Sequence, residues 1–232
     1  MKWISALLLI ALPLAAGAQD SLSVDLQADI VSNYVWRGLK LGHVSFQPTM
    51  AVSWKGLSLE ASGNTGLTNH EGDNNEIDLT LSYETGGLSL GVVDYWSDEN
   101  DARFFYYKKD ATGHIFEGFV KYDFGPVCAS WQTFFAGNDY QDDDGKRAYS
   151  SYLELTAPFQ LGGFDWQATA GAVPWASDYY DTSGFRVTNL SLKATKDIKI
   201  TNTFSLPLFG ELVGNPTSQN FYFIAGFTLQ VF

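Results

Sequence analysis

The chain has 232 residues, with 26 acidic and 14 basic side chains and a formal net charge of -12. Its length fits one all-β domain or two small ones, and its acidic balance excludes the basic patch that nucleic acid requires. Hydrophobic residues make up 45% of the chain, yet its mean hydropathy is -0.09. A bundle of membrane helices would be far more hydrophobic, whereas lipid-facing and lumen-facing residues cancel in a membrane barrel.

The first 18 residues have the pattern of an export signal. Lys2 supplies a positive charge, 4–14 is an apolar run, and Ala16-Gly17-Ala18 is a small-residue cleavage site. The run is shorter than the roughly 20 residues of a membrane-spanning helix. We therefore expect a cleaved signal peptide over 1–18 and a mature, exported chain over 19–232.

Cys128 is the single cysteine, so no intrachain disulfide can stabilise the exported chain. A closed barrel offers another source of stability, because every backbone group pairs and no sheet edge remains. Cys128 lies on the polar side of its predicted strand. We interpret it as a small packing residue rather than a nucleophile.

A two-residue alternation of apolar and polar side chains recurs from residue 22 to the C-terminus. The clearest runs are 22–30, 44–55, 57–62 and 77–84, each with one apolar and one polar face. Such alternation predicts strands with one face towards an apolar environment. The pattern is looser in later runs, which span 88–92, 116–124, 127–135, 152–157, 164–170, 190–195, 198–201 and about 220–232.

The connections between these runs alternate in length. Short connections are expected at 55–56, 85–87, 125–126, 160–163 and 196–197. Longer ones are expected at 66–75, 97–111, 138–147, 174–184 and 210–219, with a shorter one near 38–43. Five tight turns and six loops join twelve strands and place both termini on the periplasmic side. We predict an all-β, antiparallel, up-and-down transmembrane β-barrel of about twelve strands, within a range of 10–14.

Aromatic residues flank both the tight turns and the longer loops, as expected of interfacial girdles in a membrane barrel. The alternative is a soluble β-sandwich with these rings in its core, but a sandwich requires neither two aromatic belts nor an even strand count. The predicted girdle comprises Tyr34, Trp36, Trp54, Tyr83, Trp96, Tyr122, Tyr149, Trp166 and Trp175.

The polar faces of the predicted strands would line the barrel lumen. The charged candidates are nine acids, Asp25, Asp29, Glu60, Asp78, Glu84, Glu117, Asp123, Glu154 and Asp165, and five bases, Arg37, Lys55, Lys121, Lys193 and Lys199. An excess of carboxylates would favour cations in a narrow pore. Alternatively, the charges pair across a barrel that side chains fill, since twelve strands lie between filled and open barrels.

The stretch from Val31 to Gly38, Val-Ser-Asn-Tyr-Val-Trp-Arg-Gly, resembles the opening of the TorF-type family of outer-membrane porins. The Gln47-Pro48 element and the apolar hairpin at 56–63 extend the resemblance. It implies a small outer-membrane barrel with a pore role and without catalytic residues. Arg37 could attract an anion near the outer mouth or pair with Asp29 on the same face. We favour the interpretation that Tyr34 and Trp36 are girdle residues and that Arg37 forms an ion pair in the lumen.

The predicted function is passive passage of small solutes or ions across the outer membrane of a Gram-negative bacterium, without a cofactor. One alternative is a non-conducting barrel whose external loops bind a surface ligand or partner. Another is a lipid hydrolase or protease, with His43, His70 or His114 as its base. No Gly-x-Ser-x-Gly or His-Glu-x-x-His motif is present, so we predict no enzyme activity.

Two further predictions concern partners and ions. Outer-membrane lipids should surround the barrel, and the barrel-assembly machinery should recognise the terminal aromatic residue Phe232. The acidic loop 139–145 could bind calcium through its carboxylates, but its spacing does not fit a calcium-binding loop. We therefore expect a solvated loop and no metal.

Overall fold

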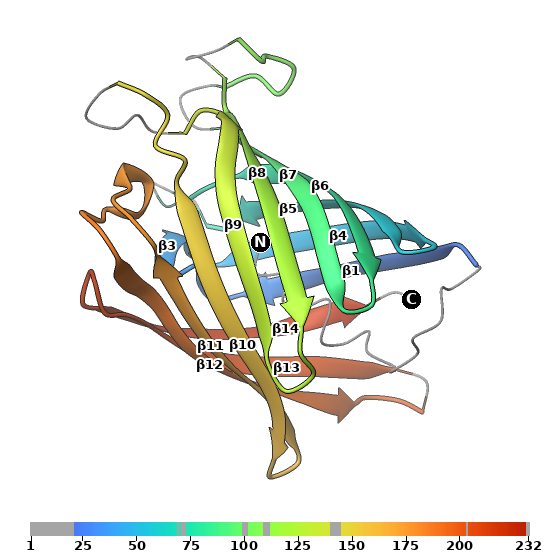
Figure 1. The fold of residues 1–232 in the computed structure, drawn as a ribbon. Helices are drawn as coiled ribbons and strands as arrows, with labels where there is room; N and C mark the ends of the chain where they lie inside the picture. The colour runs from blue at the N-terminus through green and yellow to red at the C-terminus, as the bar shows by residue number, and fades with distance from the viewer. Residues whose placement is uncertain are drawn as a thin grey trace.

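The computed structural model describes residues 21–68, 70, 73–98, 102–108, 112–139, 145–202 and 204–230. The expected signal peptide, residues 140–144 of the acidic loop and Phe232 lie outside these ranges. Twelve strands form a closed antiparallel barrel in chain order, and β1 closes it against β14 (Figure 1). They are β1 (Ser23–Val31), β4 (Ser45–Trp54), β5 (Leu57–Gly66), β6 (Glu76–Thr85), β7 (Leu88–Ser97), β8 (His114–Asp123), β9 (Cys128–Gly137), β10 (Ser151–Leu161), β11 (Phe164–Val173), β12 (Arg186–Lys199), β13 (Ser205–Asn215) and β14 (Asn220–Gln230).

The barrel confirms the predicted fold class, but the turn predicted at 196–197 and the loop predicted at 210–219 are wrong. Strand β12 continues through 196–197 to Lys199, and β13 covers the first half of the predicted loop. Lys196 keeps the outward side of the alternation, where its Nζ lies 4.7 Å from the centre of the Phe164 ring. Lys196 and Asp197 thus have the polar composition of a turn, and yet they continue strand β12. As a result β13 lies later in the chain than the strand predicted at 198–201, and residues 216–219 connect it to β14.

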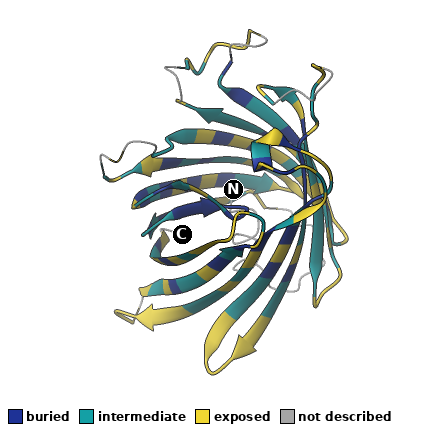
Figure 2. Cartoon of the chain, turned by 90° about the vertical axis from the view of Figure 1, so that its left-hand side faces the viewer, coloured by how far each residue is buried: buried dark blue, intermediate teal, exposed yellow. Residues whose placement is uncertain are grey.

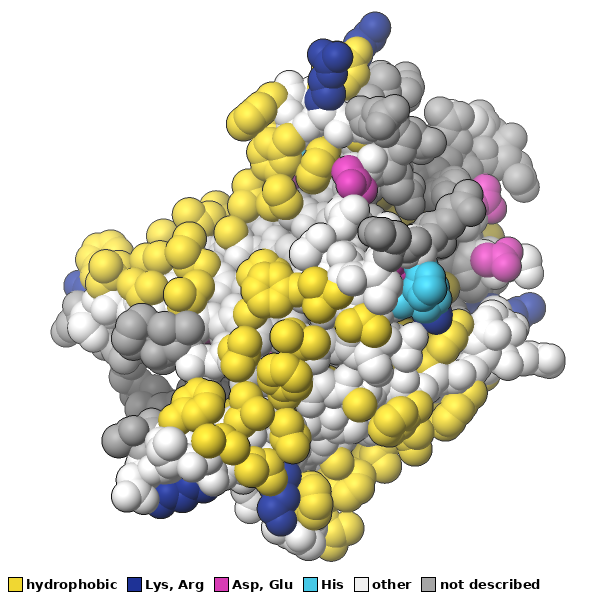
Figure 3. All heavy atoms as spheres, turned by 180° about the vertical axis from the view of Figure 1, so that it is seen from behind, with side chains coloured by type: hydrophobic (Ala, Val, Ile, Leu, Met, Phe, Trp, Pro, Cys, Tyr) yellow, Lys and Arg dark blue, Asp and Glu magenta, His cyan; other side chains and the backbone are white. Residues whose placement is uncertain are grey.

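The outside of the barrel is apolar and its inside is polar. Leu79, Leu81 and Leu155 are 38%, 48% and 53% exposed on the outer face, whereas Asp78 and Thr80 are buried inside. Figure 2 shows buried and exposed residues alternating along the strands, and Figure 3 shows hydrophobic side chains spread over the outer wall. This is the reverse of a β-sandwich, in which apolar faces meet in a dry core. Among the described residues, no helix has the length and hydrophobicity of a membrane-spanning helix.

A second, two-stranded sheet lies inside the barrel. It consists of β2 (Tyr34–Trp36) and β3 (Leu39–Gly42), which pair only with each other. The 3-10 helix η2 (Asp178–Tyr180) joins it from the connection between β11 and β12. We call β2, β3 and η2 together the plug, the end of the barrel with the tight turns the turn end, and the opposite end the loop end. The plug fills the lumen at the loop end, where the sequence predicted only a short external connection.

Candidate functional site

The plug enters the barrel through a tight turn at Arg37-Gly38. Both residues have positive φ, 50° and 81°, as in the two-residue turns that match the twist of a hairpin. A Cβ at position 38 would lie 1.8 Å from the carbonyl oxygen of Thr188 on β12, so only glycine fits. The side-chain amide of Asn215 on β13 donates to the Gly38 carbonyl at 3.2 Å. The tip of the hairpin is therefore docked against β12 and β13.

Gly38→Ala is expected to destabilise the protein by about 1–3 kcal/mol, because the backbone strain is added to a steric clash. Hydrogen exchange should become faster at 34–42 before it changes in the barrel strands. Gly184→Ala is a suitable control, since nothing lies within 4 Å of the added Cβ. Equal effects of the two substitutions on unfolding and exchange would show that the tip is not docked.

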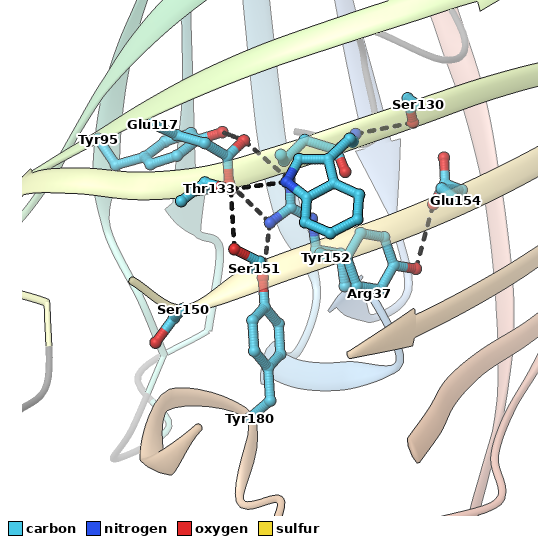
Figure 4. Close-up of polar contacts among 12 residues, drawn as sticks. Arg37, Tyr95, Glu117, Ser130, Thr133, Ser150, Ser151, Tyr152, Glu154 and Tyr180 are labelled. Atoms are coloured by element: carbon cyan, nitrogen blue, oxygen red, sulfur yellow. Dashed lines mark hydrogen bonds and ion pairs between the residues drawn. The ribbon is translucent and has the colours of Figure 1, made fainter. Parts of the chain in front are cut away.

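A buried ion pair holds the turn of the plug to the barrel wall (Figure 4). Arg37 Nη1 and Nη2 donate to the two carboxylate oxygens of Glu117 on β8 at 2.7 and 2.8 Å. Arg37 Nη1 also donates to the Tyr180 hydroxyl at 2.6 Å, and the Tyr95 hydroxyl donates to Glu117 at 3.0 Å. Burial raises the pKa of Tyr180, so its hydroxyl stays neutral beside the guanidinium. Two-point pairing of this kind fixes orientation as well as charge.

Aromatic rings surround the same guanidinium. Its central carbon lies 4.4 Å from the centre of the Trp36 ring and 4.6 Å from that of Tyr152. Tyr152 lies across β11 at Gly171, where a Cβ would be 1.8 Å from the tyrosine hydroxyl. Arg37 can remain charged in this buried place because a carboxylate and two ring faces replace water.

Two apolar clusters complete the closure on either side of the ion pair. The first contains Tyr34 and Trp36 of the plug together with Phe134, Tyr152, Val173 and Tyr180. The second contains Val35 of the plug together with Val31, Phe209, Val213 and Ile224 from the inner wall. The Tyr34 hydroxyl also donates to Glu76 on β6. The plug therefore contacts inner-wall residues of several strands around the lumen.

The plug corrects two interpretations of the sequence. Tyr34 and Trp36 are buried inside the barrel, so they do not belong to an outer girdle. Arg37 does form an ion pair in the lumen, and its partner is Glu117 rather than Asp29. Alternation along one strand could not reveal a partner 80 residues away on another strand. One signal was available: the Arg-Gly pair between two short apolar runs is compatible with a two-residue hairpin turn.

The other girdle candidates lie on the outer side, near strand ends. Trp54, Tyr83, Tyr122, Tyr149 and Trp175 are exposed, while Trp96 and Trp166 are partly covered. Trp166 lies opposite Phe159, with the two rings nearly parallel. The outer surface thus has aromatic residues towards both ends of the wall. Whether they mark the two faces of a membrane stays a prediction.

Strand register places most of the charged lumen candidates on the inner face. The inward residues are Asp25, Asp29, Glu60, Asp78, Glu84, Glu117, Lys121, Asp123, Glu154, Asp165, Lys193 and Lys199. Of these, Glu84, Asp165 and Lys199 are exposed at the turn end. Lys55 lies outside the lumen, because it occupies the turn between β4 and β5 with its Nζ 5.2 Å from the centre of the Trp54 ring.

Charge is unevenly distributed around the inner wall. Strands β1, β5 and β6 contribute Asp25, Asp29, Glu60 and Asp78, whereas Lys121 and Lys193 project from β8 and β12. A cavity of about 100 Å³ lies beneath the plug, with the Arg37 turn as its ceiling and Lys121, Cys128, Glu154, Lys193 and Glu211 among its walls. It has room for a few water molecules and polar groups to bind them.

The three histidines do not gather at one place. His43 Nδ1 lies 2.8 Å from Asp73 Oδ1, and hydrogen bonding to His43 lowers the pKa of that carboxyl. The ring of His70 lies 4.4 Å from that of His43. His114 lies apart from both and contacts Asp94. Within the described ranges, no set of three or more His, Cys, Asp or Glu side chains is placed to hold a metal ion.

No protein-family model matches the chain, and no curated protein is significantly similar to it. Function must therefore be inferred from the barrel and its interior. The described arrangement is a polar lumen, acidic on one side, that a separate hairpin occupies at the loop end. Chemically, such a lumen can hold water beside its charged groups.

Proposed function

We propose that the chain is an outer-membrane porin of a Gram-negative bacterium, which passes small solutes or ions through a lumen that the plug opens and closes. The observation on which this depends is the closed wall with an apolar outside and a charged inside. Such a wall suits a lipid bilayer around a water-filled path. The resemblance of 31–38 to the TorF-type porins supports the same assignment.

The way in which the plug is connected to the wall favours a movable gate over a plug that stays permanently in the lumen. Strands β2 and β3 form their own sheet, whereas β1 and β4 on either side of them pair directly with each other. The hairpin can therefore leave the lumen without breaking a hydrogen bond of the wall. The contacts that hold it to the rest of the barrel include the Arg37 cluster and the Asn215–Gly38 bond. The Tyr34–Glu76 hydrogen bond, the backbone bond from Asn74 to Leu41 and the two apolar clusters add to them. A solute path would open where these contacts separate.

The acidic side of the lumen favours cations. Asp25, Asp29, Glu60 and Asp78 project inward from three strands on one side of the barrel. Rings or rows of carboxylates concentrate cations in a narrow pore because water screens them poorly there. We expect small cations to pass more readily than anions of the same size once the plug has moved.

Planar-bilayer recording of two proteins, together with a control variant, tests the proposal. One is the mature chain, and the other lacks residues 34–42 with Asn33 and His43 joined by a short Gly-Ser linker. The intact chain should show rare openings, and the deletion should conduct persistently and prefer potassium over chloride in a salt gradient. A deletion of 103–108, which lies away from the plug, is the control and should behave as the intact chain.

The outcomes separate the two leading functions. Rare openings of the intact chain together with persistent, cation-preferring conductance after removal of the plug support a gated pore. If all three folded barrels stay silent, the porin assignment is wrong and the chain is a non-conducting barrel that acts through its loops. Anion preference would overturn the role of the acidic wall. Heat-modifiable mobility on gels confirms that each variant has folded.

A further inference from the structure

The connection between β7 and β8 contains an exposed segment of aromatic residues with a basic residue at each end. Its sequence over 103–108 is Arg-Phe-Phe-Tyr-Tyr-Lys, and we call it the aromatic finger. Phe105 is 89% exposed and Tyr107 54%, and Arg103 and Lys108 are exposed as well. The loop projects from the loop end at the top of Figure 1. The positive charge is local to this part of the loop, because the sequence of the whole connection, 98–113, contains four acidic and three basic residues.

The aromatic finger is anchored to the outer side of the barrel. Asp94 of β7 lies opposite Leu79 of β6, which is exposed on the outer wall, so the Asp94 side chain also points outward. The fully buried His114 binds it, with 2.7 Å between Nδ1 and Asp94 Oδ1. The other ring nitrogen, Nε2, lies 2.5 Å from the carbonyl oxygen of Phe104. His114 thus contacts Asp94 of the wall and Phe104 of the loop at once, and it joins the loop to the wall.

Ring contacts strengthen this anchor. Tyr107 stacks on His114 with 4.2 Å between the ring centres, and Phe104 lies 5.4 Å from both His114 and Trp96. Trp96 and His114 pair across β7 and β8 on the same outward side. The finger therefore lies beside the outer wall at the loop end, where Phe105 is presented away from the barrel. It does not cover the plug.

We propose that the aromatic finger binds the phosphate groups of anionic lipids in the outer leaflet. This inference rests on the proposed membrane location. Arg103 offers the planar fork of donors that suits phosphate oxygens, and Lys108 adds a second positive charge. Between them, the phenol and phenyl rings are amphipathic or apolar and suit the boundary between headgroups and hydrocarbon. The segment thus offers positive charges for phosphate and apolar rings for hydrocarbon, and this combination matches a phosphorylated amphiphile rather than a soluble anion.

Thermal unfolding of the full mature chain in dodecyl maltoside, titrated with diphosphorylated lipid A, tests the proposal. Lipid A should raise the unfolding midpoint of the intact chain. Arg103→Gln with Lys108→Gln should need on the order of a hundredfold more lipid for the same shift, since each of the two charged hydrogen bonds contributes about a factor of ten. Lys196→Gln with Lys199→Gln removes the same charge from the turn end and should leave the response unchanged.

Three results would overturn the proposal. The first is an equal response of the intact chain and the Arg103 and Lys108 double variant to lipid A. The second is the same midpoint shift with inorganic phosphate alone, which would indicate a site for the free anion. The third is an unchanged lipid response after Phe105→Ser, which would remove the role of the rings. If lipid binding fails while the plug deletion still conducts ions, this inference is wrong and the porin assignment stands.

Discussion

Glu117→Ala is expected to destabilise the folded barrel by about 3–5 kcal/mol, the largest loss we anticipate from a single inward-facing residue. The substitution leaves the buried Arg37 guanidinium without its carboxylate, and a charge unpaired in this way is costly. Arg37 and Glu117 are 8% and 1% exposed, so little water can replace the lost partner. Urea unfolding in phosphatidylcholine vesicles, followed by tryptophan fluorescence, measures the loss.

The double substitution Arg37→Met with Glu117→Leu separates lost pairing from lost packing. It removes both charges and keeps similar volumes, so most of the stability should return. The Tyr95 and Tyr180 hydroxyls lose a partner in this variant, so a small deficit should remain. If the double variant is no more stable than Glu117→Ala, an unpaired charge is not the cause of the loss.

Leu79→Arg is expected to cost about 2–4 kcal/mol in a bilayer, because it places a charge on the lipid-facing wall near the middle of β6. Leu79 is 38% exposed on that wall, and its neighbour across the sheet, Ala61, also faces outward. Leu192→Arg on β12 should cost a similar amount for the same reason. Unfolding in vesicles of lipids with matched chain length provides the measurement.

Thr80→Arg tests whether the cost depends on direction rather than on the strand. Thr80 points inward and lies opposite Glu60, so an arginine there would meet a carboxylate in the lumen. We expect a much smaller loss than for Leu79→Arg, one residue away. Equal losses at the two positions would contradict the membrane environment proposed for the outer wall.

The sequence predicted the wall better than its contents. Alternation in 22–30, 44–55 and 77–84 predicted β1, β4 and β6 to within a few residues, because one side chain in two must meet each environment. The turn expected at 196–197 was wrong because a polar dipeptide can continue a strand near its end. Most of the charged residues that were predicted to point inward lie on the inner face, because alternate residues of a strand point to the same side.

By itself the amino-acid sequence predicted an antiparallel barrel of about twelve strands with an apolar exterior and an acidic interior, although it divided β12 into two strands and missed β13. These properties follow from local alternation, which each strand displays independently of the others. Only the tertiary structure decided that the segment after β1 turns inward, that Arg37 meets Glu117, and that Phe104 is held by His114. Such contacts join residues from separate strands and loops, and they exist only when barrel closure brings those segments within bonding distance.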